Sequence, residues 1–143
     1  MNSIHVGFTG TRKGMSVNQK CCLVDILSGL TGFRAGRGLN NYVVHFHHGA
    51  CEGADVEADL IARNHGCKMY IHPSNHKTRV YCEEPGDAVY PPFPPLVRDR
   101  KIVDVVEILI AAPLTDTEVR RSGTWTTVRY ARKQKLIIEQ MKR

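Results

Sequence analysis

The sequence alternates between short apolar runs and longer segments in which apolar residues recur at helical spacing. The short runs predict five strands, at residues 4–8, 42–46, 68–72, 108–112 and 136–138. The longer segments predict four helices, at residues 16–31, 54–65, 96–106 and 123–133. Ser16 and Gln19 have the spacing of a helix capping box, and Gly66 stands where a carboxyl-terminal cap is expected.

Strands that alternate with helices are typical of an α/β protein. The run at 42–46 lacks clean alternation of apolar and polar residues, as expected for a strand that is buried on both faces of a parallel sheet. We therefore predict a Rossmann-like, doubly wound and mostly parallel sheet of about five strands with helices on both faces. No repeat is visible, so residues 1–143 are expected to form one domain.

Two connections lack any periodicity. Gly32, Gly36, Gly38 and the Asn40–Asn41 pair predict a loop after the first helix. Residues 73–95 hold six of the seven prolines, and a loop of that length is usually functional or partly disordered. The segment 90–95, with Phe93 inside, is expected to be either a lid or a packing strap.

The composition excludes several classes of protein. Of the 143 residues, 42% are hydrophobic and 24% are charged, which is unlike a disordered or collagen-like chain. No apolar run is long enough to span a membrane, and the first residues lack the pattern of a signal peptide, so a cytoplasmic location is expected. The five cysteines include no C-x-x-C pair and are expected to be reduced thiols.

The net charge of +6 is concentrated at the carboxyl-terminal end. Residues 120–143 carry eight basic side chains and one acid, Glu139, whereas residues 1–119 are nearly neutral. This distribution favours an anionic partner such as a phosphate or a nucleic acid. A solvated basic helix would have the same composition.

Three strand-to-helix turns, at residues 7–12, 48–55 and 121–127, are rich in glycine and hydroxyl residues. In doubly wound sheets, ligands bind at the carboxyl ends of the strands, near the reversal of strand order. Glycine permits close backbone approach, and helix N-termini bind phosphate or carboxylate groups. The candidate ligand-binding residues are Thr9, Gly10, Thr11, Arg12, Gly49, Glu52, Gly53, Arg100, Ser122, Gly123 and Thr124.

Arginine side chains near these turns would add bidentate, charge-assisted contacts to an anion, at Arg12, Arg98, Arg100 and Arg121. None of the turns is a G-x-G-x-x-G or Walker motif. Each turn taken alone also fits an ordinary connection between a strand and a helix that binds no ligand.

Four segments in order carry a family resemblance across nearly the whole chain. They are Gly-Phe-Thr-Gly-Thr-Arg, His-Gly-Ala-Cys-Glu-Gly-Ala-Asp-Val-Glu-Ala, Arg-Asp-Arg-Lys-Ile-Val-Asp and Ser-Gly-Thr-Trp-Thr-Thr-Val-Arg-Tyr-Ala-Arg. Their order and spacing resemble the SLOG superfamily, which includes the Smf/DprA DNA-processing proteins, the LOG phosphoribohydrolases and small stand-alone YspA/YpsA-like proteins. The small members are the most similar. The resemblance implies a nucleotide-like ligand over the three turns and a homo-oligomer of two or more copies.

The LOG enzymes cleave a nucleoside monophosphate into free base and ribose phosphate. Their site uses an Arg before a Lys, which Arg100 and Lys101 match, and a Glu shortly after a Gly-Thr turn. After Gly123 and Thr124 no such carboxylate follows. Glu52 or Asp55 would then have to replace it, although Glu52 also fits a solvated loop residue and Asp55 an interaction with its own helix start.

Three functions therefore remain as alternatives. The first is binding of a nucleotide or a nucleotide-derived ligand, as in a sensor or regulatory module. The second is N-glycosidic hydrolysis of a nucleotide, with Arg100, Glu52 and Asp55 as the candidate catalytic residues. The third is binding of single-stranded nucleic acid through the basic terminal region. No cofactor is expected.

Some further residues have more than one interpretation. His45, His47, His48 and Cys51 suggest a metal site, but His48 should point away from the other two histidines, so packed or ligand-facing histidines are favoured and no metal is expected. Trp125 fits either a base-stacking residue or a core anchor. His72 and the Ser74–Asn75 pair follow the third strand at the edge where a ribose or base would be contacted.

Overall fold

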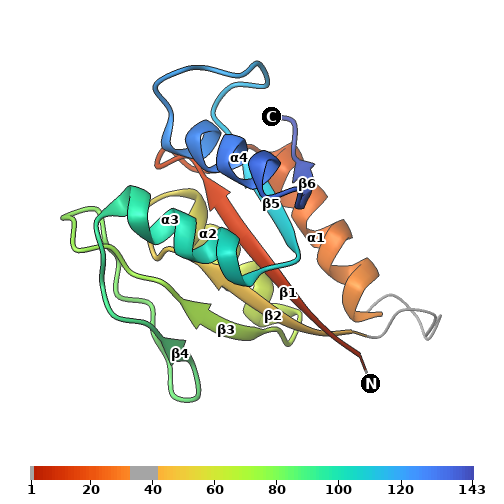
Figure 1. The fold of residues 1–143 in the computed structure, drawn as a ribbon. Coiled ribbons are helices and arrows are strands. Elements are labelled where there is room, and N and C mark those ends of the chain that lie inside the picture. The colour runs from red at the N-terminus through yellow and green to blue at the C-terminus, as the bar shows by residue number, and fades with distance from the viewer. Residues whose placement is uncertain (1, 33–41) are drawn as a thin grey trace.

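The computed structural model describes residues 2–32 and 42–143, so the predicted loop around Gly36, Gly38 and Asn40–Asn41 lies outside the described residues. Strands and helices alternate as predicted (Figure 1). The strands are β1 (Asn2–Gly10), β2 (Tyr42–His48), β3 (Lys68–Ile71), β4 (Ala88–Val89), β5 (Ile108–Ala112) and β6 (Ile137–Gln140). The helices are α1 (Val17–Thr31), α2 (Ala54–Asn64), α3 (Pro95–Val105) and α4 (Gly123–Lys133).

All pairings in the sheet are parallel, and the strand order is β4-β3-β2-β1-β5-β6. From β1 the chain first adds strands on one side, up to β4, and then adds β5 and β6 on the other. The order therefore reverses between β1 and β5, where a doubly wound sheet opens a crevice at its carboxyl edge. This arrangement confirms the predicted Rossmann-like fold.

The sheet has six strands where about five were predicted. The additional strand is β4, which lies inside the excursion at 73–95 and pairs with β3 through Tyr70 with Ala88 and Ile71 with Val89. A strand of two residues is too short to produce a periodic pattern, so β4 could not be predicted from the pattern of apolar residues.

Alternate residues of the central strand face opposite layers. Val6 and Phe8 of β1 pack in one core cluster with Leu23 and Leu27 of α1 and with the alanines of α2. Gly7 faces the other way, because a Cβ there would lie 2.9 Å from Ile102 of α3. Helices thus cover both faces of the sheet.

A second, smaller cluster lies under α3 and α4. It contains Val103, Leu109, Ala111, Trp125 and Val128. The indole of Trp125 is 2% exposed and packs inside this cluster, which makes it a core anchor in the described structure.

The helix caps follow the predicted signals. The Ser16 hydroxyl accepts a hydrogen bond from the Gln19 N–H, and the Gln19 side chain accepts one from the Ser16 N–H, as in a capping box. Gly66 has a φ of +73° just after α2, in the left-handed region that favours glycine. No helix in the described ranges is long and apolar enough to cross a membrane.

Candidate functional site

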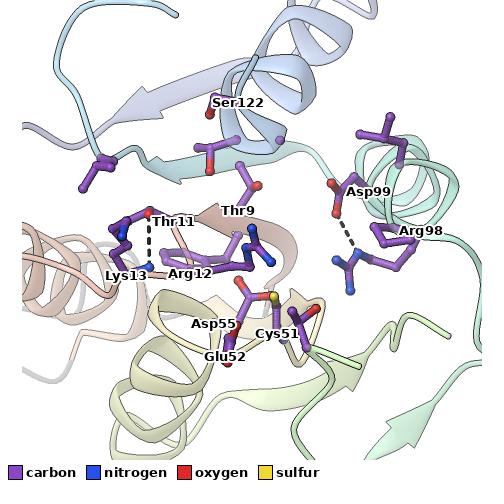
Figure 2. Close-up of a pocket in the computed structure, with 18 of the residues that line it drawn as sticks. Thr9, Thr11, Arg12, Lys13, Cys51, Glu52, Asp55, Arg98, Asp99 and Ser122 are labelled. Atoms are coloured by element: carbon purple, nitrogen blue, oxygen red, sulfur yellow. Dashed lines mark hydrogen bonds and ion pairs between the residues drawn. The ribbon is translucent and has the colours of Figure 1, made fainter. Parts of the chain in front are cut away.

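A cleft of about 930 Å³ opens at the carboxyl edge of the sheet, at the reversal of strand order (Figure 2). Its walls come from the turn after β1, the loop between β2 and α2, the first turn of α3 and the turn before α4. Nine of the predicted residues line it, namely Thr9, Gly10, Thr11, Arg12, Glu52, Asp55, Ser122, Gly123 and Thr124. Segments far apart in the sequence thus meet at one cleft.

The turn after β1 is held in place by close packing. A Cβ on Gly10 would lie 2.5 Å from the Cβ of Ala54, so only glycine lets the start of α2 approach β1 this closely. The Thr11 carbonyl accepts a hydrogen bond from the Ala54 N–H (3.0 Å), and the Thr11 N–H donates to the Ala112 carbonyl (3.0 Å). Thr9, next to the last residue of β1, lines the cleft (Figure 2).

The amino terminus of α4 forms the opposite wall. Ser122 is the N-cap, and its hydroxyl accepts a hydrogen bond from the Trp125 N–H at 3.2 Å. Within the described ranges, the N–H groups of Gly123 and Thr124 have no hydrogen-bond acceptor. A Cβ on Gly123 would meet nothing within 4 Å. This helix end is therefore open to the cleft.

Two threonine hydroxyl groups face the same space. Thr9 is 8% exposed and Thr124 is 6% exposed, and both line the cleft. Neither hydroxyl has a hydrogen-bond partner among residues 2–32 and 42–143, and neither oxygen is enclosed, since the enclosed side-chain polar atoms without a partner in these ranges are Arg79 Nε and Trp125 Nε1. Both hydroxyls are therefore accessible from the cleft and available to a ligand or water.

Cations line the β1 and α4 side of the cleft. Arg12, Lys13 and Arg121 are exposed and have no acidic partner in the part of the chain that the structure describes. Two basic side chains outside the cleft, Arg129 and Arg132, do have an acidic partner, because both bind Glu118. The free cations and the open helix end favour an anion on this side.

Asp55 shapes the loop between β2 and α2. Its carboxylate accepts hydrogen bonds from the N–H groups of Gly49 (3.1 Å) and Cys51 (3.2 Å), so it acts as a clamp on the loop before its own helix. Burial raises the pKa of Asp55, against the opposing effects of His48 and Arg98. Glu52, in contrast, is exposed at the cleft.

Gly49 and Gly53 do not line the cleft, although both were predicted to bind the ligand. Gly49 provides space for the guanidinium of Arg98, which donates a hydrogen bond to the Gly49 carbonyl. Gly53 has a φ of +88° and packs against the backbone carbonyl of Arg12. Both glycines therefore position neighbouring cleft residues.

Arg100 also lies away from the cleft. It is exposed, and its guanidinium packs over the ring of Tyr130 at 5.3 Å from the ring centre. Lys101 lies over the ring of Phe93 at 4.3 Å. The Phe93 segment pairs with residues 73–75, since the Asn75 N–H donates to the Phe93 carbonyl (3.0 Å), and so forms a strap along this loop.

The carboxylate that sequence reasoning missed is Asp99, on the first turn of α3. It lines the cleft, accepts a hydrogen bond from Arg98 Nε at 2.6 Å, and accepts another from the Thr127 hydroxyl at 3.2 Å. Burial raises its pKa, with Arg98 acting in the opposite direction. Asp99 lies within the Arg-Asp-Arg-Lys segment of the family resemblance, but only its neighbours Arg98, Arg100 and Lys101 were singled out there.

Three more cleft residues had no clear signal in the sequence. His76 and Thr78 lie in the proline-rich excursion, and their side chains hydrogen-bond to each other at 3.1 Å. Lys13 directly follows the predicted turn and was not included in it. Only their position after a strand end would have indicated them.

The residues considered for a metal site are divided between different surroundings. His45 and His47 lie on one face of β2, Cys51 lines the cleft, and His48 faces α2. In the described ranges, His48, Asp59 and Cys82 bring possible ligand atoms close together. However, His48 Nδ1 accepts the Ala50 N–H (3.0 Å), so Nε2 carries the proton that it donates to Asp59 (2.7 Å). That nitrogen is then not free for a metal.

Comparison with known proteins found similarity in structure alone. No protein-family model matches the sequence, and no curated protein does. Among solved structures, DNA processing protein A (DprA) from Streptococcus pneumoniae superposes with a TM-score of 0.69 and 18% identity over 96% of this chain. The chain spans about half of DprA, since the match covers 50% of that protein.

Two carrier or binding proteins for the molybdenum cofactor are also similar. The protein from Rippkaea orientalis has a TM-score of 0.66 at 14% identity, covering 98% of this chain and 77% of its own. The carrier protein from Chlamydomonas reinhardtii has a TM-score of 0.66 at 16% identity, covering 98% and 76%. The chain has the fold of these proteins. This confirms the predicted Rossmann-like architecture, and at these identities the similarity extends to the fold alone.

Proposed function

We propose that the chain binds a nucleotide or a nucleotide-derived ligand in the cleft, with the phosphate at the amino terminus of α4. The observation that carries the proposal is the pair of cleft-facing hydroxyls without an internal partner in the described ranges, Thr9 and Thr124, beside an open helix end. Arg12, Lys13 and Arg121 supply positive charge on the same side. Hydroxyls, backbone N–H groups and cations together are the usual ligands of a phosphate.

The volume of the cleft leaves room beyond the phosphate. Cys51, Glu52 and Asp55 line the cleft around the start of α2, and Asp99 lines it from α3 (Figure 2). These side chains offer mostly acceptor atoms, which suit the hydroxyls of a ribose or the N–H groups of a base. The two cofactor-binding proteins and DprA support a ligand at this edge only through their common fold.

The decisive experiment is isothermal titration with adenosine, AMP, ADP and inorganic phosphate. We expect the phosphorylated ligands to bind and adenosine to bind at least tenfold more weakly. Gly123→Asp should abolish binding, because the new carboxylate would lie at the helix end in open space. Gly29→Asp is the matched control, since a Cβ on this exposed α1 residue also meets nothing within 4 Å. Absence of binding by any nucleotide in an extended panel would refute the proposal.

A second candidate function is hydrolysis of the N-glycosidic bond of such a ligand. Asp55 and Asp99 give it specific support, because they are two cleft carboxylates whose pKa values are raised by burial. A raised pKa favours the protonated form of a carboxyl group, which is the form that a general acid requires, and the second carboxyl group would serve as the base. Release of free base from AMP, followed by chromatography, tests it, and Asp99→Asn should abolish the release. An intact substrate after prolonged incubation would eliminate this candidate.

The same proposal includes three further properties. They are a location in the cytoplasm, assembly into a dimer or a larger oligomer, and organisation as one domain. Light scattering on the purified protein measures the oligomer directly. Limited proteolysis tests the single domain, which should resist cleavage throughout residues 42–143.

A further inference from the structure

A second group of titratable side chains lies outside the cleft, on the face of the sheet that carries α3. His5 of β1 is paired in register with His45 of β2, and His47 of β2 is paired with Tyr70 of β3. His72 follows directly after β3. His5 and His45 are half-buried, whereas His47 is 1% exposed and His72 is 4% exposed.

Three of these imidazoles are joined in series, and we call His5, His47 and His72 the histidine chain. His5 Nδ1 lies 2.8 Å from His47 Nε2, and His47 Nδ1 lies 2.8 Å from His72 Nε2. Both ring nitrogens of the central histidine are therefore used. The chain crosses three neighbouring strands, from a half-exposed end at β1 to a buried end at the carboxyl edge of β3.

Ring stacking fixes the orientation of each member. His5 stacks on His45 with ring centres 4.3 Å apart, and His47 stacks on Tyr70 at 4.4 Å. His72 stacks on Tyr90 at 4.2 Å. Because the rings are held, the hydrogen bonds cannot easily be exchanged for others when a ring changes its charge.

The number of protons decides whether the histidine chain is intact. Each bond between two imidazoles needs one N–H and one bare nitrogen, and three neutral rings provide this in either direction along the chain. A single charged ring at the centre is still accommodated if both neighbours accept. A second charged ring leaves too few bare nitrogens to accept the N–H groups that face them. At least one of the two hydrogen bonds is then broken.

The surroundings keep the rings of His47 and His72 neutral near neutral pH. Burial lowers the pKa of His47 to about 3, and the neighbouring His72, His5, His45 and His48 add to this effect. Burial, with His48 and Arg98, lowers the pKa of His72 to about 4. The other facing groups are Lys68, which also disfavours a charge on His45, and Glu107, which alone favours it. Tyr70 and Tyr90 complete the surroundings.

The buried end of the histidine chain is tied to the cleft. The backbone carbonyl of His72 accepts a hydrogen bond from Arg98 at 3.2 Å, and the same guanidinium binds the carbonyl of Gly49. Arg98 and its partner Asp99 line the cleft. A displacement of His72 would therefore move the ends of β2 and β3 through Arg98.

We propose that the histidine chain is an acid-sensitive latch, which holds the β2–β3 side of the cleft while its rings are neutral and releases it when they take up protons. The latch depends on the contacts of His72 and Arg98 and not on any ligand. It would exist even if the cleft had a function other than the one proposed above.

The test combines two measurements on the full chain between pH 7 and pH 3. Nitrogen NMR of the histidine rings reports which ring gains a proton, and hydrogen exchange, corrected for intrinsic rates, reports local opening. We expect His47 and His72 to stay neutral to below pH 5. As they take up protons, amide protection at residues 47–51 and 71–75 should fall at least tenfold more than at β5. The strand β5 carries no member of the histidine chain and lies on the other side of β1 from β2 and β3, so it serves as the internal reference.

Two variants separate the latch from general acid unfolding. His47→Gln removes the central titrating ring, so the local loss of protection should disappear between pH 5 and pH 3. His65→Gln, which removes a histidine outside the chain, should respond as the unmodified protein does. Uniform loss of protection, or local opening while His47 and His72 remain neutral, would overturn the proposal. So would local opening that persists in His47→Gln, and the NMR measurement decides the matter if that variant does not fold.

Discussion

The backbone carbonyl of Arg12 occupies the position that a Cβ of Gly53 would need, and Gly53 has a φ of +88°. This contact joins the turn after β1 to the start of α2, and therefore sets the distance between two walls of the cleft. Arg12 is one of the free cations of the site, so its placement depends on a glycine in another turn.

Gly53→Ala should consequently destabilise the protein and displace Arg12. A side chain at positive φ costs about 1 kcal/mol, and the overlap with a backbone carbonyl adds to this, for a total of about 3 kcal/mol. Denaturant unfolding measures the loss. Gly66→Ala is the matched control, because Gly66 has a φ of +73° but nothing within 4 Å of an added Cβ. Equal losses for the two variants would mean that the contact with Arg12 is unimportant.

Much of the fold could be predicted because each strand and helix longer than a turn carries its own pattern. The capping box of Ser16 and Gln19 and the apolar run of β5 are local signals, and both were found in the sequence. The strand β4 is different, since two residues owe their conformation to pairing with β3. Nothing local encodes that pairing.

The candidate site was predictable only in part, for the same reason. The turns that contain Thr9, Ser122 and Thr124 stand directly after strands or before helices, so their residues were found. Gly49 and Gly53 show the limit of this reasoning, because a glycine in such a turn can serve packing as well as a ligand. Asp99 was missed because its role depends on which way the first turn of α3 faces.

Asp99 also supports the fold through a buried ion pair. Its partner Arg98 is 6% exposed and holds the carbonyls of Gly49 and His72. Removing one member of such a pair leaves a buried charge uncompensated, so Asp99→Asn should cost about 3 kcal/mol in stability. The exposed Glu118 pairs with Arg129 and Arg132, and Glu118→Gln should change stability much less. Thermal unfolding of both variants at pH 7 gives the comparison, and similar midpoints would contradict it.

Thiol reactivity should follow burial. Burial raises the pKa of Cys67 and of Cys82 to about 12, so at pH 8 these thiols hold about a thousandfold less thiolate than an unperturbed cysteine. Cys21 is exposed. Iodoacetamide at pH 8 should therefore modify Cys21 long before Cys67 or Cys82, as peptide mass spectrometry will show. Raising the pH toward 11 should strongly accelerate the modification of Cys67 and Cys82, provided the fold persists. Rapid modification of Cys67 at pH 8 would contradict the burial described here.

Thr9 provides a prediction in which stability is kept while binding is weakened. Its cleft-facing hydroxyl has no partner among the described residues, so Thr9→Val breaks no internal hydrogen bond and puts a methyl group of similar size on a strand. Stability should change by less than about 1 kcal/mol. Affinity for a phosphorylated ligand should fall about tenfold, because one hydrogen bond to the anion is lost.

Thr127→Val is the control for Thr9→Val. The Thr127 hydroxyl donates within the protein, to the Gly123 carbonyl at 2.9 Å and to Asp99 at 3.2 Å, so its removal should lower stability by about 1 kcal/mol. A structural role for Thr9 predicts that both variants lose stability. A ligand-binding role predicts that only Thr127→Val does, while Thr9→Val loses affinity. Because the two roles differ in these measurements, calorimetry on these two variants decides whether the hydroxyl of Thr9 serves the fold or the ligand.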